Sequence, residues 1–406
     1  MLEYPYGPRL LPPVGGGSID MWRYRALLPV EDGPIRYPLA VGGTPLVAPA
    51  ALRSALGAPR LWVKNETTGP SASMKDRATA LVLETGLRSG ASVVTTSSTG
   101  NAAIATALGA AAVGMRAVIF VSEACPRSKV AIMLELGADV VRVRAGYRAA
   151  FDVSRAAAAR FGWLDRNTGA NPVTIEGKKT LSFEVWEQLG RGVPDVVVVP
   201  VGDGPTLAGV AKGFRELKSC GAASRTPRVV GVQAEGSQPI ARAWREHAAV
   251  RPGGADTIAD GIAVPEPALG DWAVDEVRLS GGAFVTVPDE ELEAAVTLLG
   301  EHAGIRSEPA GAASLAGYRA ALRAGLVRAD ECALVMVTGR DQQLRAPEGV
   351  TKGTECTIGG HPDELPGALA GRFPGLVSVG GAGSAVSRPG LPSPIPNEVQ
   401  RSVQPG

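Results

Sequence analysis

Short runs of β-branched and other apolar residues recur along the chain, and a longer stretch with helical spacing of its apolar residues follows most of them. The run at 195–201 reads D-V-V-V-V-P-V, which is typical of a strand buried on both faces in the middle of a parallel sheet. This alternation predicts an α/β fold with doubly wound parallel sheets. Strands are expected at 61–64, 92–96, 117–121, 139–143, 195–201, 228–234 and 333–338. Helices are expected at 101–113, 128–136, 148–161, 178–189, 207–217, 289–303 and 309–324.

The regular pattern ends near residue 346. Residues 380–406 combine several prolines with Gly and Ser and show little apolar periodicity, so a flexible tail is expected over 346–406. A second irregular stretch, 250–268, is rich in Pro, Gly and Asp, and we expect it to shape the entrance of a site.

Composition indicates a globular protein with a substantial core, since 45% of the residues are hydrophobic and 20% are charged. The formal net charge is +1, so no basic surface points to a nucleic-acid partner. Arg116, Gly109 and Gly114 interrupt the apolar stretch 102–121, which favours a buried helix and a strand over a membrane span. Residues 1–17 lack an apolar core, so no signal peptide is expected. The four cysteines are far apart and form no C-x-x-C pair, which argues against a zinc site and favours a reducing cytoplasm.

The first candidate for chemistry is Lys75, in the segment S-A-S-M-K-D-R at 71–77. This segment lies between a short apolar strand and an Ala-rich helical run, so Lys75 is expected at a helix N-terminus. There the positive end of the helix dipole disfavours the charged amine, and a neutral amine can form a Schiff base. Taken alone, the segment is better explained as a solvated first turn, but three other segments reverse that preference.

Two of these segments are turns that join a strand to a helix, where α/β sheets bind ligands. The first crowds hydroxyls and helix N-terminal amides together, which suits a carboxylate or a phosphate, although hydroxyl residues also favour ordinary helix caps. It consists of Ser97, Ser98, Thr99, Gly100 and Asn101. The second turn suits a phosphate, although an acidic residue and a proline without an amide hydrogen weaken that interpretation. It consists of Gly202, Asp203, Gly204, Pro205 and Thr206.

The third segment ends in Thr338, after a buried apolar strand. Its hydroxyl could bond a ring nitrogen or could simply be satisfied at the end of the strand. Together, Lys75, the two turns and Thr338 match the needs of pyridoxal 5'-phosphate: an amine, a phosphate site, a carboxylate site and a neutral partner for the ring.

From about residue 24 to 339, the chain resembles the threonine synthase group of fold type II pyridoxal phosphate enzymes. The resemblance is carried by G-T-P-L at 43–46, S-A-S-M-K-D-R at 71–77, S-S-T-G-N at 97–101, N-P at 171–172, E-G-K-K-T at 176–180, V-Q-A-E-G at 232–236 and E-P-A at 308–310. It implies two α/β domains with the cofactor in the cleft between them, and a homodimer. The domains expected are an N-terminal extension over 1–20, a large domain over 21–82 and 166–345, and a small domain over 83–165.

The resemblance also implies a role for each candidate residue. Lys75 would be the Schiff-base lysine and the main proton shuttle, ahead of Lys178 and Lys179 as rival amines. Asn101 would bond the ring hydroxyl of the cofactor, and Thr338 would face the pyridine nitrogen. The turn 97–100 would cradle the carboxylate of an amino-acid substrate, and the turn 202–206 would hold the cofactor phosphate.

The chain departs from the family pattern at Thr174, where the family has an arginine that grips the phosphate of O-phosphohomoserine. We expect Thr174 to lie against the substrate, with Arg127, Lys129 or Arg306 as replacement cations. The default activity is conversion of O-phospho-L-homoserine and water to L-threonine and phosphate. A β-replacement or dehydratase reaction on a serine- or threonine-type substrate and a catalytically silent binding protein stay open. A nucleotide-binding protein is disfavoured, because no G-x-G-x-x-G follows a strand.

Overall fold

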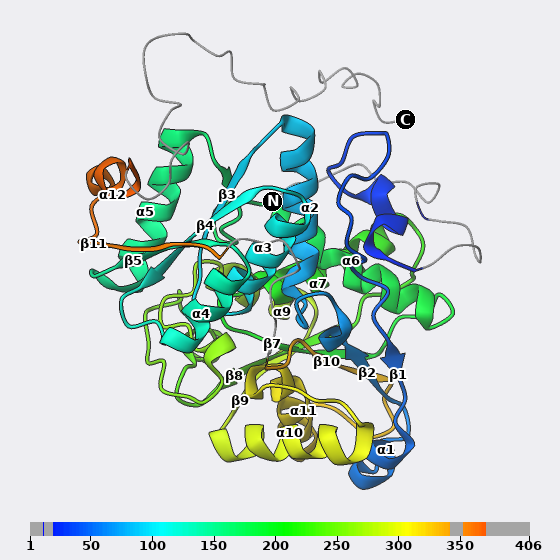
Figure 1. The fold of residues 1–406 in the computed structure, drawn as a ribbon. Helices are drawn as coiled ribbons and strands as arrows, with labels where there is room; N and C mark the ends of the chain where they lie inside the picture. The colour runs from blue at the N-terminus through cyan, green and yellow to red at the C-terminus, as the bar shows by residue number, and fades with distance from the viewer. Residues whose placement is uncertain (1–10, 12–18, 342–351, 371–406) are drawn as a thin grey trace, which may run out of the picture.

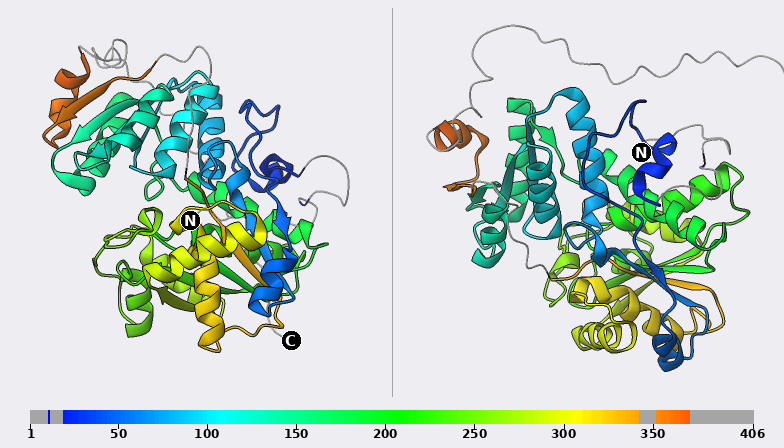
Figure 2. Two further views of the ribbon diagram at one scale, coloured as in Figure 1. Left: turned by 60° about the horizontal axis from the view of Figure 1, so that its bottom comes forward. Right: turned by 45° about the vertical axis from the view of Figure 1, so that its right-hand side comes forward.

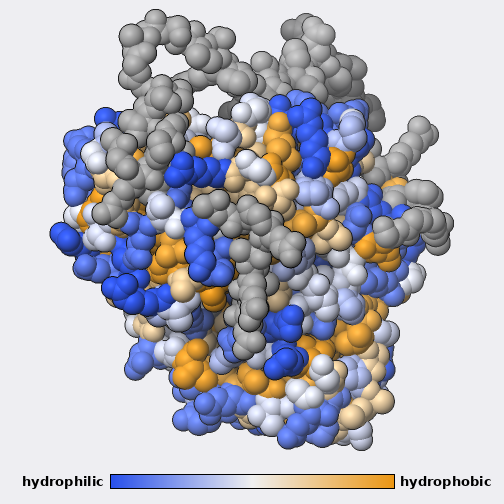
Figure 3. All heavy atoms as spheres, viewed as in Figure 1, coloured by the Kyte–Doolittle hydropathy of each residue, from blue (hydrophilic) through white to orange (hydrophobic). Residues whose placement is uncertain are grey.

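The computed structural model describes Leu11, residues 19–341 and residues 352–370. Within this part of the chain, the strands form one sheet of six and one of five (Figure 1). Figure 2 shows the five-stranded sheet and its helices on one side of the molecule and the six-stranded sheet on the other. On the face drawn in Figure 3, hydrophilic and hydrophobic residues are interspersed in small patches. None of the described helices is long and apolar enough to cross a membrane.

The six-stranded sheet has the order β1 (Leu46–Val47), β2 (Leu61–Asn65), β10 (Ala333–Val337), β7 (Val196–Pro200), β8 (Arg228–Ala234) and β9 (Ala283–Val287). Apart from the antiparallel pair of β1 and β2, all neighbours are parallel. Strand β7 lies inside the sheet and is buried along its whole length, as its apolar run predicted. Val196 and Val198 pack into one core cluster, and Val197 and Val199 into another, because successive strand residues face opposite sides of the sheet.

Helices cover both faces of this sheet, which makes it doubly wound. One face packs against α11 (Pro309–Arg323). Helix α10 (Asp289–Ala303) packs on α11, and α1 (Ala50–Leu56) packs on α10. The other face, which carries Val197 and Val199, is covered by α6 (Val173–Gln188), α7 (Pro205–Ser219), α8 (Pro239–Glu246) and α9 (Gly270–Leu279). Helix α6 begins five residues before the predicted start at 178, and α1, α8 and α9 were not predicted.

The five-stranded sheet is parallel throughout and has the order β11 (Glu355–Ile358), β5 (Asp139–Val143), β4 (Arg116–Ser122), β3 (Val93–Ser97) and β6 (Leu164–Asp165). One face is covered by α2 (Lys75–Ser89), α3 (Asn101–Ala112) and α4 (Arg127–Glu135). The other packs against α5 (Gly146–Phe161) and α12 (Leu365–Ala370). The remaining helical turns are the 3-10 segments η2 (Met21–Leu27), η3 (Glu66–Thr68), η4 (Asp260–Ile262) and η5 (Pro362–Glu364).

Strand β11 contradicts part of the flexible tail predicted from residue 346. It pairs in parallel with β5, and Ile358 and Leu365 are buried against the same sheet. The run E-C-T-I is too short to be recognised as a strand on its own, and it becomes one because β5 offers an open edge. The remainder of the predicted tail, and most of the predicted extension over 1–20, lie outside the described residues.

Candidate active site

A cavity of about 630 Å³ lies where the carboxyl ends of strands from both sheets meet. Its lining includes Lys75 and Thr338, the whole turn 97–101 and the whole turn 202–206. Residues 260–265 of the Pro- and Gly-rich loop, which was expected to shape the entrance of a site, also line it. The fold therefore brings four segments that are far apart in sequence to one place.

Lys75 is the first residue of α2, and the end of β10 fixes the backbone around it. The Met74 amide donates to the Thr338 carbonyl at 2.9 Å, and the Arg340 amide donates to the Ala72 carbonyl at 3.2 Å. Burial lowers the pKa of the Lys75 amine; the carboxylate of Glu308 opposes this shift. A lowered pKa increases the neutral, nucleophilic fraction of an amine at physiological pH.

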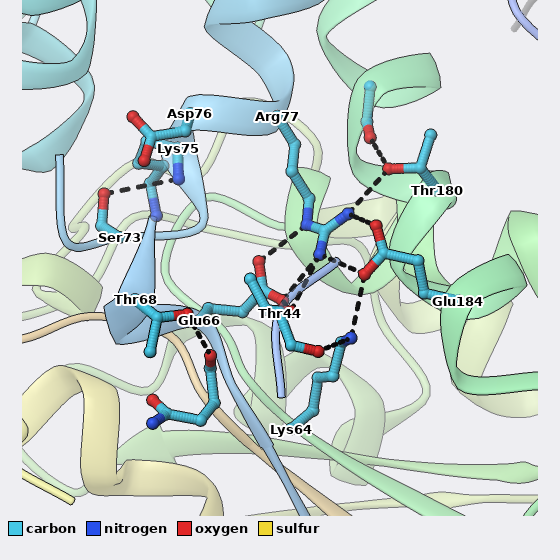
Figure 4. Close-up of polar contacts among 12 residues, drawn as sticks. Thr44, Lys64, Glu66, Thr68, Ser73, Lys75, Asp76, Arg77, Thr180 and Glu184 are labelled. Atoms are coloured by element: carbon cyan, nitrogen blue, oxygen red, sulfur yellow. Dashed lines mark hydrogen bonds and ion pairs between the residues drawn. The ribbon is translucent and has the colours of Figure 1, made fainter. Parts of the chain in front are cut away.

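A buried charge cluster holds the helix that carries Lys75, and the sequence did not reveal it. Figure 4 shows Arg77 reaching from α2 between Glu66 and Glu184. Its guanidinium donates to Glu66 at 2.7 and 2.8 Å and to Glu184 at 2.6 and 2.8 Å. Lys64 donates to Glu184 at 2.9 Å and to the Thr44 carbonyl at 2.7 Å. The charges of the two buried cations and the two buried carboxylates sum to zero. Their ion pairs connect α2 to β2 and α6.

The turn 97–101 is fixed from two directions. Asn167 accepts a hydrogen bond from the Ser97 amide at 2.7 Å, and Asn101 Nδ2 donates to Glu308 Oε1 at 2.7 Å. The hydroxyl of Ser97 is buried and has no hydrogen-bond partner among the described residues. Because Ser97 lines the cavity and α3 begins at Asn101, this turn offers a hydroxyl and helix N-terminal amides to an anion.

The turn 202–206 leads into α7 with a glycine that the geometry requires. Gly204 has φ +97°, and a Cβ there would lie 2.5 Å from the Leu269 carbonyl oxygen. Since α7 starts with Pro205, the amides of Thr206 and the residue after it are the first donors without a helical acceptor. The carboxylate of Asp203 accepts from the Ala268 amide at 2.5 Å. Burial raises the pKa of Asp203 to about 6, while that hydrogen bond and Lys178 oppose the rise.

Of the predicted site residues, all of which the structure describes, Thr174 alone does not line the cavity. It is fully buried in the first turn of α6, and its hydroxyl donates at 2.7 Å to the carbonyl of Asn171, which lies just before that helix. The hydroxyl of this short side chain is engaged in that local hydrogen bond, and the side chain does not line the cavity. The expectation that Thr174 contacts the substrate directly therefore finds no support in the geometry.

The cations of the cavity also differ from those expected. Lys129 lines the cavity and pairs with Asp260, whereas Arg127 and Arg306 are exposed and lie outside the lining. Arg166 and Lys178 line it instead. Arg166 and Glu308 were not predicted as site residues. Arg166 directly follows strand β6, which has only two residues. Recognising that strand in the sequence would have placed Arg166 at a strand end, where the site residues lie.

Comparison with known proteins identifies the family of the chain. Residues 37–339 match the family described as pyridoxal-phosphate dependent enzyme. The chain is 34% identical to the threonine synthase of Methanocaldococcus jannaschii, over 84% of each chain. It is 36% identical to that of Methanosarcina acetivorans, over 82% of this chain and 81% of the relative. Among solved structures, maize serine racemase has a TM-score of 0.64 at 24% identity, covering 74% of this chain and 89% of that one, which shows a shared fold.

Proposed function

Since this chain belongs to the pyridoxal-phosphate dependent enzymes and is threonine synthase-like, we propose that it converts O-phospho-L-homoserine and water to L-threonine and phosphate. One observation carries the proposal. The Lys75 amine, two anion-binding turns and Thr338 line a single cavity at the carboxyl ends of strands. That is the position where α/β sheets bind ligands.

The residues of the cavity fit pyridoxal 5'-phosphate. The cofactor needs an amine, a phosphate site and polar partners for its ring, and the lining contains a buried hydroxyl and a buried guanidinium nitrogen that lack partners among the described residues. When bound, the cofactor stabilises negative charge on carbons next to the substrate amine, which is the chemistry of elimination and replacement. In this proposal, Lys75 attaches it, Asn101 and Thr338 orient its ring, and the turn 202–206 holds its phosphate.

Lys178 supports the phosphate site at the turn 202–206. Its amine is buried in α6 and donates a hydrogen bond to the Thr174 carbonyl at 3.3 Å. No carboxylate of the described residues lies within ion-pair distance of it. Burial lowers its pKa well below the usual value, with Arg166 and Lys75 acting in the same direction and Asp203 against it. A phosphate bound at the turn would be repelled by the Asp203 carboxylate, and a protonated Lys178 amine would offset that repulsion, so we assign Lys178 to the phosphate site.

The same residues supply the proton transfers. The Lys75 amine is neutral more often than an exposed lysine, so it can take a proton from the substrate and return it to another carbon. Glu308 accepts the 2.7 Å hydrogen bond from Asn101 and so fixes that side chain. Its carboxylate also stabilises the charged form of the Lys75 amine, which partly offsets the lowering of the pKa of that amine by burial. The turn 97–100 binds the substrate carboxylate and so orients the amino acid for these transfers.

The test is a panel of substrates supplied to the purified protein with cofactor. Phosphate and threonine should appear from O-phospho-L-homoserine, and borohydride should fix the cofactor to Lys75. Pyruvate or 2-oxobutyrate from serine or threonine, without phosphate release, would favour the dehydratase alternative. The buried position of Thr174, which leaves no side chain from that residue in the cavity, is the observation that keeps this second function in view. A protein that turns over none of these compounds would be the silent homologue.

We also infer a homodimer located in the cytoplasm. All four cysteines are free thiols, and three of them are buried, which suits a reducing compartment. Light scattering at several protein concentrations tests the dimer. A mass of one chain, about 42 kDa for the 41.6 kDa sequence, would overturn it.

A further inference from the structure

Arg166 is a buried cation in the cavity lining, and no carboxylate of the described residues pairs with it. It is 1% exposed and follows strand β6, where its amide donates to the Thr95 carbonyl at 2.9 Å. Nε donates to the Thr79 hydroxyl at 3.1 Å, and Nη1 donates to the Thr168 hydroxyl at 2.8 Å. In the part of the chain that the structure describes, Nη2 is buried without a hydrogen-bond partner, and no carboxylate lies within ion-pair distance of the guanidinium.

Such an arrangement is costly unless a ligand completes it. Burying an unpaired charge is strongly unfavourable, and the two hydroxyl acceptors are neutral. Burial lowers the pKa of Arg166 to about 10, with Asp165 and Asp76 opposing, so the group is still charged at neutral pH. The planar guanidinium, held by Nε and Nη1, presents its remaining donors in a fixed direction, which suits the oxygens of a phosphate.

The other anions of the reaction already have places in the cavity. The turn 202–206 with Lys178 suits the cofactor phosphate, and the turn 97–100 at the start of α3 suits the substrate carboxylate. Lys129, the other cation considered for the substrate, is already paired with Asp260. Arg166 lies beside Thr168, whose carbonyl is 3.4 Å from the Thr174 hydroxyl, so its guanidinium is close to the start of α6.

We infer that Arg166 binds the phosphate on the side chain of the substrate and so determines that the enzyme accepts a phosphorylated amino acid. This inference rests on the proposed function. It assigns a phosphate-binding residue that directly follows β6 of the five-stranded sheet, whereas the turn 202–206 follows β7 of the six-stranded sheet.

The test compares two unreactive ligands in the holoenzyme by calorimetry. L-2-amino-5-phosphonopentanoate carries a phosphonate that cannot leave, and L-norvaline lacks it. Arg166→Met should weaken phosphonate binding by about 10- to 100-fold and change L-norvaline binding by less than about 3-fold. Arg166→Lys should give an intermediate loss, because it keeps the charge without the planar fork. Lys129→Met is the matched control and should change both affinities by the same factor.

An equal loss for both ligands in Arg166→Met would overturn the inference, because it would mean a role in the carboxylate site or in folding. Unchanged phosphonate binding would overturn it as well, as would a selective loss in Lys129→Met alone. These outcomes are separate from failure of the proposed function. That failure would be the absence of phosphate release from O-phospho-L-homoserine by the wild-type protein, whatever the ratio of the two affinities.

Discussion

Replacing Arg77 with methionine should destabilise the protein strongly, because it leaves two buried carboxylates without their shared cation. Arg77, Glu184 and Lys64 are at most 1% exposed, and Glu66 is 2% exposed. The substitution removes four hydrogen bonds of 2.6–2.8 Å between the guanidinium and the two carboxylates. The net charge of the cluster changes from zero to one negative charge, with only Lys64 left to balance two anions.

Loss of one partner from a buried ion pair costs about 3–5 kcal/mol, because the remaining charge stays buried and unpaired. The stability of a native protein is about 5–15 kcal/mol, so this substitution should remove a large fraction of it. Urea unfolding followed by circular dichroism gives the change as a shift in the midpoint at constant slope.

The matched control is Arg148→Met, which breaks an exposed pair with Asp152 at 3.0 Å on the surface of α5. We expect no measurable loss there, because exposed pairs contribute little. If Arg77→Met lowered the free energy of unfolding by less than about 1 kcal/mol, or by no more than the control, the two buried carboxylates would not depend on Arg77 for their stability.

The pH dependence gives an independent measure of the same cluster. Burial alone would raise the pKa of Glu184, but Arg77 and Lys64 lower it to about 2. A folded-state pKa below the unfolded value means that this contribution to stability is complete above about pH 4.5 and is lost as the pH falls toward 2. In Arg77→Met the depression is smaller, so the difference in unfolding free energy between the two proteins should shrink below about pH 4.5. A difference that stays constant from neutral pH to that range would contradict this explanation.

Lys75→Ala should prevent borohydride from fixing the cofactor to the chain, and a fixed cofactor at Lys178 in peptide mass mapping would refute the assignment. Asp203→Asn should strengthen cofactor binding at about pH 8 but not at about pH 5, because the wild-type carboxylate, with a pKa of about 6, is charged only at the higher pH. Equal affinity gains at both values in equilibrium dialysis would contradict the placement of Asp203 at the phosphate turn. A chain that ends at residue 351 should unfold several degrees below one that ends at residue 370, since only the former uncovers the edge of β5. Equal melting temperatures would show that β11 contributes nothing to stability.

The local sequence pattern was sufficient to predict an element or a site segment where the residues of that segment alone determine its structure. The apolar run at 195–201 predicted a central strand, and β7 is buried and lies between β10 and β8. Lys75 was predicted at the start of a helix because a strand and an Ala-rich run flank it, and it is the first residue of α2. The strand-to-helix turns at 97–101 and 202–206 were recognised in the same way, and both line the cavity.

Local pattern was insufficient where a residue depends on a distant partner. Strand β11 exists because β5 has an open edge more than 200 residues earlier in the chain, as the pairing of Glu355 with Val140 shows. Arg77 looks like an ordinary helix residue in the sequence, and only the approach of Glu184 from α6 makes it the centre of a buried cluster. Arg166 follows a strand of only two residues, which is too short to be recognised by periodicity.

The chain by itself therefore determined the α/β class, the type of chemistry and the segments that carry it, because hydrophobic spacing and strand-to-helix turns are properties of neighbouring residues. The tertiary structure decided which charged side chains face the cavity and which are balanced elsewhere. Thr174 donates to a local carbonyl, and Lys129 is paired with Asp260. Arg166 and Lys178 have no carboxylate partner among the residues that the structure describes. The physical reason is that the free energy of a charge depends on what surrounds it within a few ångströms, and in this protein those surroundings come from segments that only folding brings together.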